Sequence, residues 1–160
     1  PKGAGGLSAA ADWPVGECFA SPSWHEQGAR VVVVFTRSHP SGRTAVAHFD
    51  LDLATQGVTA VHAGLVAQPE QALAYAVQYI ADDEPVLEST PELVVKLVQE
   101  AAAHGRAGGH AQPADLEGAL ELFAGIDPSE CLHDIRVGEP PPPPPKKKTL
   151  FAWLFGSWWE

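Results

Sequence analysis

Methionine is absent from the 160 residues of this chain, and cysteine occurs only twice, as Cys18 and Cys131. The missing methionine indicates that the initiator residue has been removed or that the chain has been trimmed. Because the two cysteines lie far apart, with no C-x-x-C pair and no visible signal peptide, we expect free thiols in a reducing, cytoplasmic compartment. A single disulfide between Cys18 and Cys131 is the alternative.

Basic residues are also scarce, since ten Lys and Arg stand against twenty Asp and Glu, for a net charge of −10. This charge repels phosphate backbones and removes the electrostatic attraction on which most nucleic-acid binding depends. We therefore expect no nucleic-acid partner. The charge is uneven: up to Glu139 there are seven Lys and Arg against nineteen Asp and Glu, whereas the remaining tail has three lysines and one glutamate. Body and tail thus carry opposite charges.

The length fits one domain with its own core. We predict a flexible Gly/Ala-rich leader over residues 1–11, a single α+β domain over 12–138, a polyproline and lysine linker over 139–149, and an aromatic docking tail over 150–160. The expected fold is an antiparallel sheet of three to five strands packed on two or three helices, followed by the proline-tethered aromatic tail.

The strongest local signal is a hairpin between Ala29 and Leu53. The five residues from Val31 to Phe35 are all apolar, which predicts a central strand covered on both faces. The turn chemistry of His39-Pro40-Ser41-Gly42 follows, and the chain then alternates from Thr44 onwards. We expect one face of this second strand to join the core and the other, with Thr44, Val46, His48, Asp50 and Asp52, to be mostly exposed to solvent.

Weaker signals predict the remaining elements. Residues 12–19 predict at most an edge strand, and Pro22 and Gly28 delimit a helical turn. Either Ser89 or Thr90 caps the N-terminus of a helix with an apolar stripe from Leu93 to Ala101. Further strands are expected at Gly57 to Ala67 and Cys131 to Val137, and further helices at residues 68–82 and Pro113 to Ala124.

Several of these positions together resemble an uncharacterised family of bacterial proteins of similar size with no known function. The likeness spans Glu17 to Leu116. Its positions are Glu17-Cys18, Trp24, Glu26, Gly28, the apolar strand ending near Arg37, Gly42-Arg43, the strand ending at Asp52, Gly57-Val58, the helix from Leu93, and Gly109 to Leu116 with Asp115. The resemblance implies a shared fold and no particular activity.

The chain departs from that family's pattern after the second strand. Thr55, Thr59 and Ala60 stand where polar or reactive residues would be expected, and Pro113 stands where a histidine would be expected. If the family has a catalytic site, this member would have lost part of it.

The best catalytic candidate is His48-x-Asp50-x-Asp52, because a period of two places all three side chains on one face of a strand. An imidazole and two carboxylates could share a metal ion there, as in a small metal-dependent hydrolase. His104 and His110 could complete such a site. A plain solvated strand face is the alternative, and we expect no cofactor.

Other reactive-looking residues favour structural roles. The glycines from Gly105 to Gly109 lack the Lys-Ser/Thr of a phosphate-binding loop, so they are expected to cap and connect helices. His62 is expected to be a packed histidine, the acidic run from Asp82 to Glu84 a solvated helix end, and Cys18 an inert thiol despite His25 nearby.

The tail carries the clearest functional signal. Pro140 to Pro145 favour a polyproline II rod about 19 Å long at roughly 3.1 Å per residue. Beyond Lys146 to Lys148 lies an aromatic run that a soluble chain leaves exposed only if something covers it. We predict a non-enzymatic interaction or adaptor module that docks this run on a partner protein or a second copy. Its docking residues are Phe151, Trp153, Leu154, Phe155, Trp158 and Trp159.

Two alternatives for the tail remain open at this stage. The aromatic residues could fold back onto their own domain. They could also bind a membrane surface, because lysines beside Trp, Phe and Leu suit the lipid–water interface, although about eleven residues are too few to span a bilayer.

Overall fold

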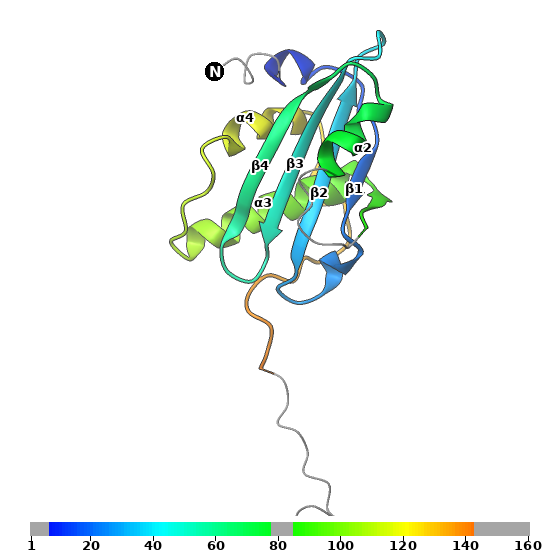
Figure 1. The fold of residues 1–160 in the computed structure, drawn as a ribbon. Helices are drawn as coiled ribbons and strands as arrows, with labels where there is room; N and C mark the ends of the chain where they lie inside the picture. Colours follow the sequence, from blue (N-terminus) through cyan, green and yellow to red (C-terminus); the bar gives the residue numbers. More distant parts are fainter. Residues whose placement is uncertain (1–6, 78–84, 143–160) are drawn as a thin grey trace, which may run out of the picture.

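A five-stranded antiparallel sheet, in the order β4-β3-β2-β1-β5, forms the centre of the protein. The structure is a computed structural model that describes residues 7–77 and 85–142. The helix α3 crosses one face of the sheet and the shorter helix α2 covers part of the other (Figure 1). This arrangement confirms the predicted α+β class.

The elements have the following bounds. The strands are β1 (Cys18–Ala20), β2 (Arg30–Ser38), β3 (Thr44–Asp52), β4 (Gly57–Val66) and β5 (Leu87–Ser89). The α-helices are α2 (Glu70–Val77), α3 (Pro91–Ala107) and α4 (Leu116–Leu120), and the 3-10 helices are η1 (Pro22–His25), η2 (Glu121–Phe123) and η3 (Pro128–Glu130).

The strand β2 lies third of five, which confirms that the apolar run is central. Val33, Val34 and Phe35 have no exposed surface, because side chains on both faces of β2 are covered. The turn after β2 is closed by a hydrogen bond of 2.8 Å from the N–H of Gly42 to the carbonyl oxygen of His39. Gly42 adopts a φ of 99°, a conformation that L side chains avoid.

The main core lies between the sheet and α3. The apolar stripe of α3 is buried against the sheet, chiefly β4 and also β1 to β3, and Phe123 joins this core with its ring edge-on to Phe35 at a centroid distance of 5.0 Å. Thr90, not Ser89, caps α3, since its Oγ1 accepts a hydrogen bond from the N–H of Leu93. Ser89 instead ends β5.

Two glycines allow α3 to lie directly on the turn between β3 and β4. A Cβ atom on Gly57 would come within 2.4 Å of the carbonyl oxygen of Ala101, and one on Gly105 within 2.3 Å of the carbonyl oxygen of Gln56. Real carbon and oxygen atoms cannot approach so closely, so both positions require glycine for close backbone packing.

The second face of β3 is buried, and the prediction that it is mostly exposed is wrong. Thr44, Val46 and His48 are at most 1% exposed, and Asp52 is 7% exposed. Ala72 and Tyr75 of α2 pack over Val46 and its neighbours to form a small second core. Local alternation indicates which residues share a face, but it does not reveal that a later helix covers that face.

Three other predicted elements differ from the structure. Residues 7–10 of the predicted leader are helical, and Leu7 and Ala10 are buried in the main core. The strand β1 is not at the edge, since β5 pairs with its outer side. The last α-helix is only five residues long and continues as η2.

Residues 131–137 form no strand, so the predicted closing strand is wrong. Their backbone carbonyls are bound by separate donors: Lys96 Nζ donates to Cys131 at 3.1 Å, and the N–H of Gly28 donates to Arg136 at 3.0 Å. These contacts hold the segment against the body without a strand ladder.

Candidate functional site

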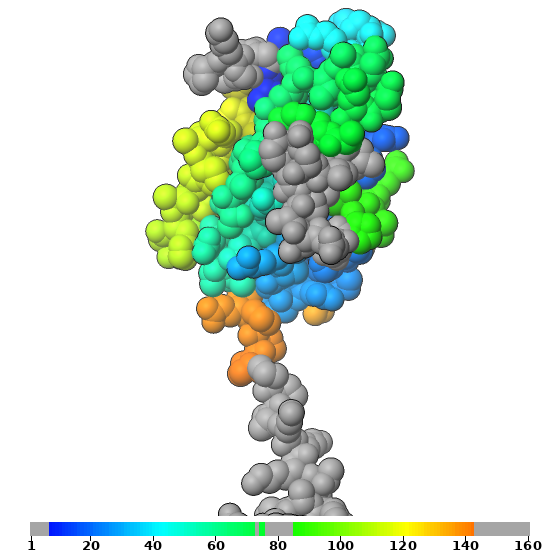
Figure 2. Space-filling view, in the orientation of Figure 1, coloured from blue at the N-terminus to red at the C-terminus, as the bar shows by residue number. Residues whose placement is uncertain are grey.

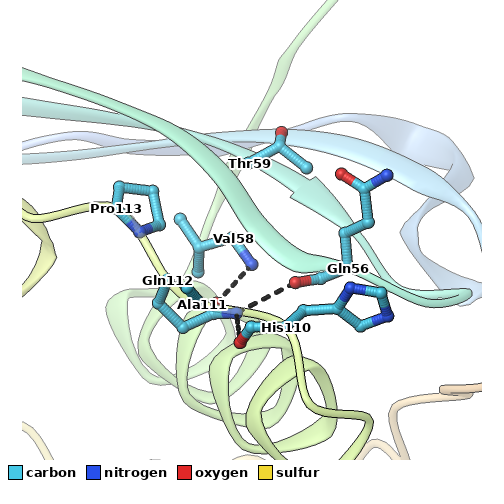
Figure 3. A pocket seen from close by; sticks show the side chains of 7 residues that line it. All are labelled: Gln56, Val58, Thr59, His110, Ala111, Gln112 and Pro113. Atoms are coloured by element: carbon cyan, nitrogen blue, oxygen red, sulfur yellow. Dashed lines mark hydrogen bonds between the residues drawn. The ribbon is translucent and has the colours of Figure 1, made fainter.

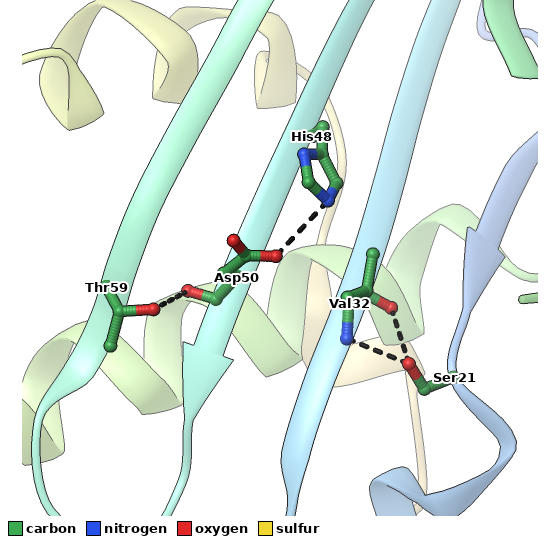
Figure 4. Close-up of polar contacts among 5 residues, drawn as sticks. All are labelled: Ser21, Val32, His48, Asp50 and Thr59. Carbon is green, nitrogen blue, oxygen red and sulfur yellow. Dashed lines mark hydrogen bonds and ion pairs between the residues drawn. The ribbon is translucent and has the colours of Figure 1, made fainter. Parts of the chain in front are cut away.

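The predicted metal-binding strand face contains a close contact between His48 and Asp50. The Nε2 atom of His48 lies 3.3 Å from Oδ1 of Asp50 (Figure 4). The His48 side chain is fully buried, whereas that of Asp50 is 32% exposed. This face therefore buries its histidine and leaves its carboxylate partly open to solvent.

Asp52 has a different role from the one predicted. Its Oδ1 accepts a hydrogen bond of 3.0 Å from the N–H of Ala54, and its Oδ2 accepts one of 3.0 Å from the hydroxyl of Thr55. Burial alone would raise the pKa of Asp52, but these hydrogen bonds and weaker ones from the amides of Thr55 and Gln56 outweigh it and lower that pKa. Asp52 thus organises the turn between β3 and β4.

The other histidines do not complete a ligand set with His48. His62, its direct partner on β4, stacks against it with the ring centroids 5.6 Å apart and the planes 14° apart. His104 instead contacts the carbonyl oxygen of Ala54 through Nε2 at 3.0 Å. Within residues 7–77 and 85–142, no group of three or more His, Cys, Asp or Glu side chains is arranged to hold a metal ion.

The cysteines are both free and buried, which confirms the predicted thiols and excludes the alternative disulfide. Burial raises the pKa of Cys18 to about 11, so its thiol is not activated as a nucleophile. His25 has other partners than the Cys18 thiol. Its ring contacts Trp24 edge-on, and its Nδ1 lies 2.9 Å from the carbonyl oxygen of Pro22.

An open pocket of about 300 Å³ lies where β4 meets the segment after α3 (Figure 3). Gln112 lines it and binds two backbone groups: Oε1 accepts from the N–H of Val58 at 2.8 Å, and Nε2 donates to the carbonyl oxygen of Gln56 at 2.9 Å. The Gln112 side-chain amide therefore bonds to the backbone at residues 56 and 58 as the peptide group of a neighbouring strand would. The pocket is lined by Gln56, Val58, Thr59, His110, Ala111, Gln112 and Pro113.

Sequence reasoning missed both Gln112 and Arg37. Arg37 is 5% exposed, and its guanidinium donates at 2.7 Å to the carbonyl oxygens of Trp13 and Leu122 and also to that of Ala124. Burial lowers the pKa of this guanidinium. The sequence did contain a signal for Arg37, because a charged residue stands near the end of an apolar strand. No local signal marks Gln112, because its partners Gln56 and Val58 are more than fifty residues away and the one near partner is the carbonyl oxygen of His110.

The path toward the tail is fixed where it leaves the body. The N–H of Gly138 donates to the carbonyl oxygen of Leu53 at 2.8 Å, and Gln27 Nε2 donates to that of Val137 at 2.8 Å. Residues 139–142 are exposed and project from one end of the body (Figure 2). The predicted docking residues Phe151, Trp153, Leu154, Phe155, Trp158 and Trp159 lie outside the described residues, as do Pro143 to Thr149 and Asp82 to Glu84.

The comparisons with known proteins add no relative, because no protein-family model, curated protein or solved structure matches the chain. In the part of the chain that the structure describes, no helix has both the length and the apolar composition needed to cross a membrane.

Proposed function

We propose that the protein is a non-enzymatic interaction module whose aromatic C-terminal tail docks on a partner protein or on a second copy. The observation that carries this proposal is the anchored exit of the chain at Gly138. Hydrogen bonds to Leu53 and Gln27 hold this point to the body, and the exposed residues that follow lead outward toward the aromatic run.

The tail has the composition of a binding element. Trp and Tyr, together with Arg, dominate the energetics of protein interfaces, and large aromatic side chains each remove about 150–250 Å² from water when they are buried. The stiff polyproline segment lowers the conformational entropy lost on docking. Three lysines before the aromatic run further separate it from an apolar core.

The candidate catalytic groups in the body have structural partners. Asp52 caps a turn, the Cys18 thiol has a raised pKa, and the side-chain amide of Gln112 is hydrogen-bonded to backbone groups. These contacts support binding over the rival function of a metal-dependent hydrolase. Metal analysis of the purified protein tests that rival directly. Two buried free thiols fit a reducing compartment, and we propose a cytoplasmic location on that basis.

The proposal is tested by truncation. A chain ending at Pro142 keeps every residue that the structure describes, and one ending at Thr149 also keeps the linker and its lysines. We expect both to melt within about 2 °C of the full chain, because they lose no described core contact. Both should lose any association seen for the full chain by sedimentation velocity, or by affinity purification from the same cell extract.

Two other results would argue against the proposal. A clear fall in melting temperature for a truncated monomer would mean that the tail completes the core of its own chain. Binding of the full chain to anionic vesicles, lost in a Trp153→Ala, Trp158→Ala variant, would favour the membrane-surface alternative.

A further inference from the structure

The two edges of the sheet are protected to different degrees. β5 is only three residues long and carries Glu88, and short charged edges resist pairing with other strands. β4, at the opposite edge, is ten residues long and contains no charged residue and no proline (Figure 1). β4 therefore lacks the usual sequence features that keep an edge strand from adding a further strand.

The register shows which backbone groups of β4 point outward. The N–H of Leu53 donates to the carbonyl oxygen of Ala29, so odd-numbered residues of β3 face β2 and even-numbered residues face β4. His48 is opposite His62, so His62 and the other even-numbered residues from 60 to 66 face β3. The N–H and C=O groups of Val61, Ala63 and Leu65 consequently point away from the sheet.

One end of this outer edge is already covered. The Gln112 side chain accepts the outward N–H of Val58, and an irregularity in the pairing follows at Asp50 and Leu51. Beyond it, no described residue forms a backbone hydrogen bond with the outer side of residues 61–65. Leu65, which is 37% exposed, lies on this open stretch.

We propose that the outer edge of β4, from Ala60 to Val66, receives Leu150 to Phe155 of a second copy as an added strand. This inference rests on the proposed function, for which it supplies the acceptor surface. Backbone hydrogen bonds to Val61, Ala63 and Leu65 would supply affinity in the manner of β-strand addition. The alternating large side chains of the tail would extend over the faces of the sheet.

Length and charge favour this occupant. The open edge spans seven residues, and the apolar run before Gly156 spans six, Leu-Phe-Ala-Trp-Leu-Phe. Lys146 to Lys148 precede it, and they complement a body with nineteen acidic and seven basic residues. The three aromatic side chains of this run, Phe151, Trp153 and Phe155, would bury roughly 450–750 Å², which is most of the roughly 800 Å² that each partner contributes to a stable interface.

The exit geometry favours a second copy over the same chain. Residues 138–142 run away from the end of the sheet (Figure 1). Measured from Pro140, a polyproline II rod over the six prolines would reach about 19 Å outward, whereas the four residues Lys146 to Thr149 would span at most about 14 Å. A linker of that form would be too short to bring Leu150 back to its own β4 edge. Reciprocal exchange of two tails would close a symmetric dimer.

The experiment compares self-association of full-length variants by sedimentation velocity. Ala63→Pro removes an outward N–H and places a ring on the open edge, but it breaks no hydrogen bond to β3. Ala63→Ser is the matched control that keeps the N–H. Leu65→Lys places a charge on the same edge. We expect Ala63→Pro and Leu65→Lys to weaken self-association by about tenfold or more, with melting temperatures close to that of the full chain, and Ala63→Ser to associate normally.

The tail truncation after Thr149 makes the outcomes distinguishable. Loss of self-association in both this truncation and Ala63→Pro supports the inference. If the truncated chain stays monomeric while Ala63→Pro associates normally, the tail docks elsewhere: the inference fails and the proposed function stands. If the truncated chain still associates and Ala63→Pro does not, β4 pairs with another β4 and the tail is not its occupant. A full chain that stays monomeric at every concentration overturns the inference, whichever other partner the tail binds.

Discussion

The imidazole rings of His48 and His62 stack across adjacent strands, with their planes 14° apart and their centroids 5.6 Å apart. His48 is fully buried, and Asp50 lies 3.3 Å from its Nε2 atom. The pair sits on the sheet face where the small second core of Val34, Val46 and Ala72 forms. It therefore contributes to packing in the middle of the sheet.

The first prediction separates the ring of His48 from its polar contact. His48→Phe keeps a flat ring against His62, so we expect it to cost at most about 1 kcal/mol, because the Asp50 carboxylate is partly exposed and its pairing is weak. His48→Ala removes the whole ring and should cost about 2–4 kcal/mol through the cavity it leaves. Urea unfolding measures both. Equal losses in the two variants would show that the polar contact, rather than packing, matters.

The second prediction concerns the turn cap at Asp52. Asp52→Ala should lower the free energy of unfolding by about 1–2 kcal/mol, because several donors lose a charged acceptor. Asp50→Asn is the control on the same strand face and should change stability by less than about 0.5 kcal/mol.

The pKa of Asp52 also predicts how this difference depends on pH. Because folding lowers that pKa, the unfolded chain binds the proton more readily, and the stabilisation is complete above the unfolded pKa of about 4. It is lost as the pH falls through the lower folded pKa. The gap in unfolding free energy between wild type and Asp52→Ala should therefore shrink below about pH 4. A gap that stays constant down to pH 2 would contradict this assignment.

The third prediction is whether replacing Gly105 of α3 by alanine raises or lowers the stability of the protein. Helix propensity alone predicts that Gly105→Ala stabilises the protein by roughly 0.5–1 kcal/mol. The structure places the new methyl group 2.3 Å from the carbonyl oxygen of Gln56, so the helix would have to move off the β3–β4 turn. We expect a loss of about 1–3 kcal/mol instead. Thermal unfolding decides between them, and any increase in melting temperature would contradict the close packing.

The sequence predicts local features of this fold well where one segment contains the whole signal. The apolar run of β2, the turn at Gly42 and the proline after Thr90 each specify their structure without distant partners. The burial of Val46 and the position of β1 inside the sheet depend on α2 and β5, which come later in the chain. The same holds for Gln112, whose function is to satisfy backbone groups more than fifty residues away.

Asp52 shows a different limit of sequence reasoning. An aspartate just before Leu53-Ala54-Thr55-Gln56-Gly57 fits a side chain that caps a turn as well as a metal ligand on a strand face. The strand period identified its face, but only the hydrogen bonds to Ala54 and Thr55 assign its role.

The last prediction concerns Arg37, which joins three parts of the chain. Its guanidinium holds the carbonyl oxygens of Trp13, Leu122 and Ala124, so one side chain ties the N-terminal segment and the end of η2 to β2. Arg37→Met keeps much of the side-chain volume but leaves three carbonyls without this donor. We expect a loss of about 2–4 kcal/mol in urea unfolding, because each buried acceptor left unpaired costs about 1–3 kcal/mol and water satisfies part of this demand.

Arg37→Lys is the matched variant. It keeps the positive charge but has a single nitrogen, which cannot follow the planar fork of the guanidinium toward three acceptors. It should recover at most about half of the loss. Full recovery by lysine would mean that charge alone is required at this position, and an Arg37→Met protein as stable as wild type would show that the three segments are held together by packing.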